Sequence, residues 1–281
     1  MITIFSNPRP FQGAFGIIQR NAIKSWLKLQ PECEIILFED EEKTTSKVAE
    51  EFGVQCITDA KCNEFGTPLI NDVFDKVKKV AKNKIIVQVN ADIILMSDFL
   101  KTIESVSDKI ESKPFFMSGR RWDLDIKEDI NFEEREWEFK LRELIKKEGE
   151  LHGFSGMDYW VISLNFPFEI PPFVIGRPGI DSWLIFKSRS CKMPVVDSTE
   201  LVTIIHQNHN YPKKKNPFFN IEKQRNLDLA GGFAHMGTLR DADWLFTAEG
   251  FKKPPFLRRI ISKMTLFYPW RQILALKRKI Q

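Results

Sequence analysis

The pattern of apolar and polar positions changes regularly along the first hundred residues. Runs of consecutive apolar residues, which are typical of buried strands, lie at residues 2–5, 34–38, 54–57, 84–89 and 93–95. Apolar residues at helical spacing predict helices at residues 16–29, 44–52, from 67 onward and after 97. Gly53 is expected to end the second helix, and Thr67-Pro68 to open the third. This alternation predicts a mostly parallel sheet with helices on both faces.

The second half of the chain is less regular. Apolar runs predict strands at residues 115–119, 158–164, 195–196 and 201–205. Helices are expected at residues 132–148 and 180–187, and residues 212–250 are expected to be rich in loops. Residues 252–281 combine apolar residues at helical spacing with basic ones, which predicts basic amphipathic helices interrupted at Pro269.

Composition favours one large folded domain with a basic tail. The chain has 281 residues, of which 43% are hydrophobic, so it can bury a sizeable core. Residues 252–281 hold nine of the 42 Lys and Arg residues and none of the 38 Asp and Glu residues. This tail indicates an anionic partner, and we weigh binding to a membrane surface equally against packing on the domain. Nucleic acid is not the expected partner.

The remaining global features indicate an intracellular location. The four cysteines, Cys33, Cys56, Cys62 and Cys191, form no CxxC pair and are expected to be reduced thiols. The chain opens directly on a predicted strand without a basic leader, and it has no apolar run of transmembrane length. We therefore expect a cytoplasmic protein, peripheral on the inner face of a membrane if the tail binds lipid.

Several common α/β enzyme classes lack their motifs here. The sequence contains no GxGxxG, GxxxxGK[ST], HExxH or GxSxG pattern. These absences argue against a dinucleotide-dependent dehydrogenase, a P-loop NTPase, a zincin and an α/β-hydrolase.

Polar residues follow the predicted strands, where parallel sheets bind ligands. They are Ser6, Asn7, Asp40, Asn90 and Asp92. Asp92 interrupts an apolar run, so its carboxylate needs a partner such as a divalent metal bound to a diphosphate. The alternative is a strand-end aspartate that caps a turn or helix.

Histidines and an aspartate late in the chain add candidate chemistry. His206 and His209 follow a predicted strand and could complete a metal shell, bind a diphosphate, or be ordinary loop residues. Asp181 stands at a predicted helix start, where it is either a helix cap or a general base that deprotonates an acceptor hydroxyl.

Two further segments are candidates for ligand contacts. Arg120 and Arg121 could hold phosphates, and Trp122 could stack on a sugar ring, although a surface salt-bridge cluster explains them equally well. Asp158 and Trp160 follow a glycine-containing segment and could line an acceptor pocket, the alternative being a tight turn into a core strand.

The order of segments 63–69, 89–95, 119–123 and 206–209 resembles the GT-A glycosyltransferase superfamily over about residues 1–240. The resemblance implies an α/β fold, a GT-A-like Rossmann-type sandwich with a mostly parallel central sheet. Residues 1–250 would form the catalytic domain, with a nucleotide-sugar half at 1–110 and an acceptor half at 111–250. Residues 251–281 would form the basic amphipathic tail.

The resemblance also implies roles for the candidate residues. Asn90-Ala91-Asp92 corresponds to the Asp-x-Asp element that binds Mn²⁺ or Mg²⁺, although its first position is Asn. His206 or His209 would add a metal ligand. The nucleotide would contact Ser6, Asn7 and Asp40, which lie after the first two strands. Asp181 would be the base of an inverting reaction.

The expected function is transfer of a sugar from a nucleoside-diphosphate sugar, UDP first among them, to a hydroxyl of a glycan or lipid-linked acceptor. One alternative, a sugar-nucleotide pyrophosphorylase, usually has a glycine-rich basic loop after the first strand, and residues 6–10 are not such a loop. A second alternative is a non-catalytic, membrane-attached protein that binds the sugar nucleotide. A nucleic-acid-binding protein, the third, rests on the basic tail alone.

Overall fold

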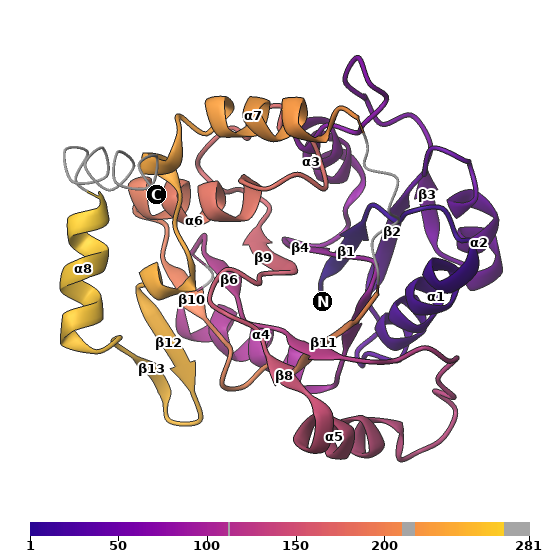
Figure 1. Ribbon diagram of the computed structural model, residues 1–281. Coiled ribbons are helices and arrows are strands. Elements are labelled where there is room, and N and C mark those ends of the chain that lie inside the picture. The colour runs from indigo at the N-terminus through magenta and orange to yellow at the C-terminus, as the bar shows by residue number, and fades with distance from the viewer. Residues whose placement is uncertain (112, 210–216, 267–281) are drawn as a thin grey trace.

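The computed structural model describes residues 1–111, 113–209 and 217–266 (Figure 1). Within these residues the main sheet has nine strands in the order β13-β12-β10-β6-β9-β4-β1-β2-β3. Their bounds are β1 Thr3–Ser6, β2 Glu34–Phe38, β3 Gln55–Ile57, β4 Ile85–Val89, β6 Phe116–Ser118, β9 Tyr159–Ser163, β10 Val195–Asp197, β12 Trp244–Thr247 and β13 Gly250–Lys252. A smaller sheet has the order β5-β11-β7-β8, with β5 Ile93–Leu95, β7 Trp122–Leu124, β8 Glu150–Leu151 and β11 Ile204–Gln207.

Strand directions make the main sheet mixed but mainly parallel. β1 pairs in parallel with β2 and β4, β2 with β3, and β10 with β6 and β12. β9 runs antiparallel between β4 and β6, and β13 runs antiparallel to β12. Insertion of β9 brings the residue before it, Asp158, beside Asn90 at the end of β4, where the Asn90 amide donates to the Asp158 carbonyl over 2.9 Å.

Helices cover both faces of the main sheet, as the alternating pattern predicts. The described helices are α1 Gly13–Leu27, α2 Thr45–Phe52, α3 Ile70–Val80, α4 Asp98–Lys109, α5 Trp137–Glu148, α6 Ile180–Ser190, α7 Phe219–Leu229 and α8 Phe256–Leu266. Successive strand residues point to opposite faces, so Ile4 joins a core with α1, α2 and α4 while Phe5 joins one with α3 and α6. Two hydrophobic cores therefore enclose the sheet.

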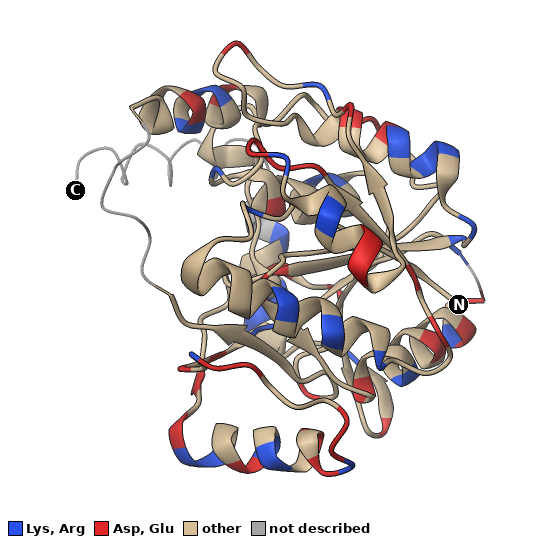
Figure 2. Cartoon of the chain, turned by 90° about the vertical axis from the view of Figure 1, so that its right-hand side faces the viewer, with Lys and Arg blue, Asp and Glu red and all other residues tan. Residues whose placement is uncertain are grey.

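The smaller sheet has a core of its own. Ile94, Leu124 and Ile205 from its strands pack with Leu141 and Ile145 from α5. The opposite face of α5 carries interspersed acidic and basic residues (Figure 2), as expected for a helix with one side in water. This sheet fixes the position of β11 relative to β5, on which the candidate site depends.

Several predicted elements are confirmed, among them the strand at 34–38 and the helix that ends at Gly53, which has φ 66°. Three predictions were wrong. The third helix begins at Ile70 and not at Pro68, because Pro68 and Leu69 form isolated bridges with Cys62 and Val174. The helix expected from residue 132 begins at Trp137. Residues 212–250, expected to be loop-rich, contain α7 and β12.

The basic tail is described only as far as α8. Residues 267–281, where the second predicted helix falls, lie outside the described residues. Among the described helices, none combines the length and the apolar character needed to cross a membrane.

Candidate metal centre and its surroundings

The centre is built where β4 of the main sheet leads into β5 of the smaller one. Asp92 stands immediately before β5, and β5 pairs antiparallel with β11, so that His206 lies opposite Ile93. The Gln207 amide donates to the Asp92 carbonyl over 3.3 Å, and the Gln207 side chain donates to the Asp92 and Ile18 carbonyls. Strand pairing and this buried glutamine hold Asp92 against the end of β11.

Asp92, His206 and His209 form a compact cluster. His209 Nε2 lies 3.0 Å from Asp92 Oδ2, and His206 Nε2 lies 3.6 Å from the same oxygen. One ligand atom of each residue lies within 4.8 Å of the others. The His209 ring also packs on Phe15 of α1, with ring centroids 4.9 Å apart. Two segments far apart in the sequence, the β4–β5 junction and the end of β11, thus contribute one oxygen and two nitrogens to a single point.

The chemistry of these three side chains fits a divalent cation. Asp92 Oδ1 is buried and has no hydrogen-bond partner among the described residues, so one carboxylate oxygen remains for a ligand. Burial alone would raise the pKa of Asp92, but the two histidines outweigh it and hold that pKa far below its usual range. An ionised carboxylate with two imidazoles is a donor set for a first-row transition metal.

Asp123 links the metal centre to a third histidine that sequence reasoning did not place in the site. Its Oδ2 lies 2.7 Å from His152 Nδ1, and its Oδ1 lies 3.0 Å from His206 Nδ1 without hydrogen-bond alignment. Arg121 Nε donates to Asp123 Oδ1 over 2.8 Å. The negative charge of Asp123 therefore lies beside the ring nitrogen of His206 that faces away from Asp92, the side on which supporting carboxylates stand behind metal-binding histidines. The sequence feature that could have indicated a role for Asp123 was its position at the end of the Gly119–Asp123 segment.

Asp158, predicted to line an acceptor pocket, is the buried partner of two other predicted residues. Arg121 donates to its Oδ2 over 2.7 Å, and Asn90 Nδ2 donates to its Oδ1 over 2.7 Å. Burial and the nearby charge of Asp92 raise the pKa of Asp158, and Arg121 opposes that shift. Asn90 thus anchors β4 to β9, which gives a structural reason for an amide at this position.

Asp181 lies in the first turn of α6 and interacts electrostatically with Asp158. The helix starts after Gly179, whose φ of 120° favours glycine. Burial and then the charge of Asp158 raise the pKa of Asp181 to about 7. Its contact with its own backbone amide opposes the shift, and among the described residues no other side chain donates a hydrogen bond to it. Asp181 does not cap α6, since Gly179 occupies that position.

Asn7 has the feature expected of a ligand contact. Both polar atoms of its side chain are buried, and neither has a hydrogen-bond partner among the described residues. It lies directly after β1, at the same end of the sheet as Asn90 at the end of β4. A buried amide that can donate and accept at once suits a nucleobase edge.

Other predicted residues are engaged elsewhere. Ser6 Oγ donates to the Val89 carbonyl over 2.6 Å. The Asp40 carboxylate accepts hydrogen bonds from Thr44 and Thr45 at the start of α2. Arg120 donates to the Leu151 and His152 carbonyls. Trp160 is 6% exposed in the core.

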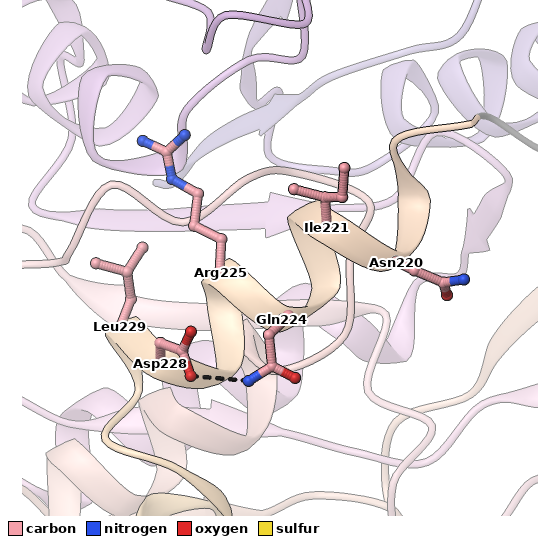
Figure 3. A pocket seen from close by; sticks show the side chains of 6 residues that line it. All are labelled: Asn220, Ile221, Gln224, Arg225, Asp228 and Leu229. Carbon is pink, nitrogen blue, oxygen red and sulfur yellow. Dashed lines mark hydrogen bonds between the residues drawn. The ribbon is translucent and has the colours of Figure 1, made fainter.

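A surface hollow of about 800 Å³ lies apart from this cluster (Figure 3). Its lining comes from one side of α7 alone, including Ile221, Arg225 and Leu229. Glu222 and Asn226 of α7 are fully buried against the rest of the molecule, and Arg225 also pairs with Glu64. The hollow contributes no residue to the metal centre.

Comparison with known proteins identifies the fold. No family model and no curated protein sequence matches the chain. The structure is similar to that of GalNAc-T7 with UDP, GalNAc and Mn²⁺, with a TM-score of 0.52 and 14% identity over 82% of this chain and 48% of that one. Glucosyl-3-phosphoglycerate synthase from Mycobacterium tuberculosis gives a TM-score of 0.45 and 12% identity over 83% of this chain and 80% of that one.

TarS 1-349 from S. aureus, with UDP-GlcNAc, gives a TM-score of 0.34 and 14% identity over 44% of this chain and 35% of that one. The chain thus spans less than half the length of TarS 1-349 and of GalNAc-T7. The likeness to GalNAc-T7 shows that this chain has the GT-A fold.

Proposed function

We propose that this GT-A-fold chain is a metal-dependent glycosyltransferase that moves a sugar from a nucleoside-diphosphate sugar to an acceptor hydroxyl. The observation that carries the proposal is the cluster of Asp92, His206 and His209 at the β4–β5 junction. A divalent cation held there would supply the positive charge that binds a diphosphate and stabilises it as a leaving group.

The donor set favours Mn²⁺ over Mg²⁺. Mg²⁺ favours all-oxygen coordination, whereas two of the three candidate ligands here are imidazoles. The two carboxylate oxygens of Asp92 differ in role, because Oδ2 faces the histidines and Oδ1 has no partner among the described residues. We expect Mn²⁺ to support donor binding better than Mg²⁺.

The donor nucleotide is proposed to lie over the ends of β1 and β4. Asn7 offers its unpartnered amide to the base, while Asp92 lies toward the diphosphate. Ser6 and Asp40 could contribute only through backbone atoms or by rearrangement, because their side chains already have intramolecular partners. GalNAc-T7 was crystallised with UDP, which makes UDP the first nucleotide to test.

Asp181 is proposed to take the proton from the acceptor hydroxyl. A carboxylate with a pKa of about 7 is ionised in a useful fraction at neutral pH and is more basic than an ordinary one. Attack from the side of Asp181 would give a single displacement with inversion. The acceptor would be a glycan or a lipid-linked saccharide. Trp122 is partly exposed on β7, but it packs against the core of the smaller sheet, on the other face from Asp123 and His206.

The test is calorimetric titration of UDP, GDP and their sugars into the protein, with Mn²⁺, with Mg²⁺ and without metal. We expect one nucleotide to bind with Mn²⁺ and at least tenfold more weakly without it. Asp92→Ala should abolish the effect of metal, since it removes the carboxylate ligand and leaves two imidazoles alone. Binding by Asp92→Ala equal to that of the parent protein would refute the metal site.

A matched control separates loss of the ligand from loss of the fold. Asp125→Ala removes an aspartate that follows β7 and whose side chain, among the described residues, accepts a hydrogen bond from the exposed Asn208 alone, so it should leave donor binding unchanged. The rival function, a non-catalytic sugar-nucleotide binder, predicts the same titration but no turnover in any acceptor mixture. Release of pyrophosphate from a nucleoside triphosphate and a sugar phosphate would instead indicate a pyrophosphorylase.

A further inference from the structure

Helix α8 contacts the rest of the molecule through polar side chains. Arg258 donates to the carbonyls of Leu239 and Arg240, and its guanidinium lies 3.4 Å from Asp197. One turn later, Ser262 is 4% exposed and donates to Asp241 Oδ1 over 2.9 Å. Residues 258 and 262 are spaced so that they share one face of a helix. Between residues 256 and 263, where the side chains are described, the attachment of α8 to the domain is therefore polar.

Four large apolar residues in the first two turns of α8, the part whose side chains are described, face solvent instead. Phe256 is 74% exposed, Leu257 is 68% exposed, Ile261 is 54% exposed and Ile260 is 38% exposed. A helix packed on its own domain normally buries such residues and exposes the polar ones. The reversed arrangement is typical of a surface that is covered by something outside the domain.

Positive charge accompanies this apolar face. Arg259 and Lys263 are exposed on α8, and the whole of residues 252–281 has no acidic residue. On the domain side, Arg258 lies 5.4 Å from the Phe154 ring, and Arg120 and Arg240 lie 4.8 Å from the same ring. Three guanidinium groups thus surround one ring beside α8, and the carboxylates of Asp197 and Asp241 lie near them.

We propose that α8 binds the surface of a lipid bilayer that contains anionic lipids. Phe256, Leu257, Ile260 and Ile261 would enter the boundary between headgroups and acyl chains, while Arg259 and Lys263 would contact headgroup phosphates. Apolar side chains flanked by cations match both layers of such an interface. Figure 1 places α8 at one edge of the molecule, where a flat surface can reach it.

A second copy of the chain could also cover the apolar face of α8 with its own, but electrostatic repulsion disfavours such a dimer. Two copies of α8 related by a twofold axis would bring Arg259 and Lys263 of each close to those of the other. Neither copy offers an acidic residue between positions 252 and 281 to compensate them. An anionic bilayer removes this repulsion, so the observations favour lipid.

Binding of α8 to a bilayer does not depend on the chemistry at Asp92, but it would fix how the candidate site is oriented relative to the membrane. The Leu239 amide, next to the α8 contact, donates to the Phe154 carbonyl over 3.1 Å. Phe154 belongs to the segment that leads into Asp158. A bilayer on α8 would therefore lie on the side of the molecule from which this segment enters the centre.

The experiment is co-sedimentation of the full chain with vesicles of phosphatidylcholine alone or mixed with phosphatidylglycerol, at low and high salt. We expect binding to the anionic vesicles only, weakened at high salt because the charge contribution is screened. Phe256→Ser with Leu257→Ser should weaken that binding at least tenfold, since two exposed apolar anchors are lost. The matched control, Phe139→Ser with Ile221→Ser, removes two exposed apolar residues elsewhere and should bind normally.

Charge is tested separately with Arg259→Glu and Lys263→Glu, for which we again expect at least tenfold weaker binding. The control is Lys146→Glu with Lys147→Glu on α5. Absence of sedimentation with any vesicle, or undiminished binding by Phe256→Ser with Leu257→Ser, would overturn the proposal. A dimer that ignores vesicles and dissociates in that same double variant would assign the face to a second copy of the chain.

Discussion

At the scale of single residues, the pKa values of two aspartates, Asp92 and Asp181, are shifted in opposite directions. Histidines hold the pKa of Asp92 far below its usual range against the effect of burial, so that it is ionised at any working pH. Asp181 has no such partner among the described residues, and burial together with Asp158 raises its pKa to about 7. Two carboxylates pushed apart in this way are suited to different tasks, a ligand and a base.

Asp181 should therefore set the acidic limb of the pH profile. Below about pH 7 the carboxyl is protonated and cannot accept a proton, so kcat/KM should fall as the pH is lowered through that value. Asp181→Asn should lower kcat by about 100-fold or more with donor affinity unchanged. Initial rates between pH 5 and 9 and donor titrations measure both effects. Near-normal turnover by the variant would exclude Asp181 as the base.

Asp158→Asn is the control for the electrostatic origin of that limb. It removes a charge that raises the pKa of Asp181, so the limb should move to lower pH while the base itself remains. Arg121 retains Asp123 as a partner in this variant. A limb that stays in place would show that burial alone sets the pKa of Asp181.

At the scale of elements, α7 holds the segment that precedes Asp181. Its Glu222 is fully buried and accepts hydrogen bonds from Asn63 Nδ2, Thr67 Oγ1 and Arg177 Nε at 2.6–2.7 Å. Asn226, also on α7, bonds to the amide and the carbonyl of Val174. The helix thus joins the loop before α3 to the loop before α6.

Loss of the Glu222 charge should destabilise the protein. Glu222→Gln leaves Arg177 without its buried counter-charge, and we expect a loss of about 2–4 kcal/mol in the free energy of unfolding. Urea denaturation measures it, with the exposed neighbour Asn220→Ala as the control expected to change stability by less than about 0.5 kcal/mol. Equal stability of the two variants would contradict the structural role given to α7.

At the scale of the whole molecule, the candidate metal centre is assembled only when the chain folds. Asp92 and His206 are 114 positions apart, and pairing of β5 with β11 brings them together. An ion that binds this arrangement and not the unfolded chain stabilises the native state by mass action. Folding and binding of the proposed ion should therefore be coupled.

Mn²⁺ should raise the midpoint of thermal unfolding. At a concentration 100 times its Kd, the ion would add about 2.7 kcal/mol, or roughly 5 °C for a chain of this size. Thermal melts with and without Mn²⁺ measure the shift. His209→Ala should abolish it, whereas His235→Ala, which alters a histidine outside the cluster, should retain it. A thermal shift that persists in His209→Ala would show that the ion binds at another site.

The sequence by itself determined the layered α/β architecture and most of its strands. Burial on a sheet or a helix leaves a local period in the chain, and for that reason the strand at 34–38 could be predicted to the residue. Interruption of an apolar run by Asp92, and the two histidines after another run, also carried a local signal. The structure brings these three residues together.

Only the tertiary structure decided which polar residues share a site. Ser6 and Asp40 also follow strands, but a carbonyl and the start of α2 engage their side chains. Asp123 acquires its role from His152 and His206, and Glu222 from Arg177 and Thr67. Burial of a residue on a sheet or a helix produces a periodic pattern in the sequence around it. Hydrogen-bond partners that are distant in the chain depend on how the elements pack, and this packing produces no such local pattern.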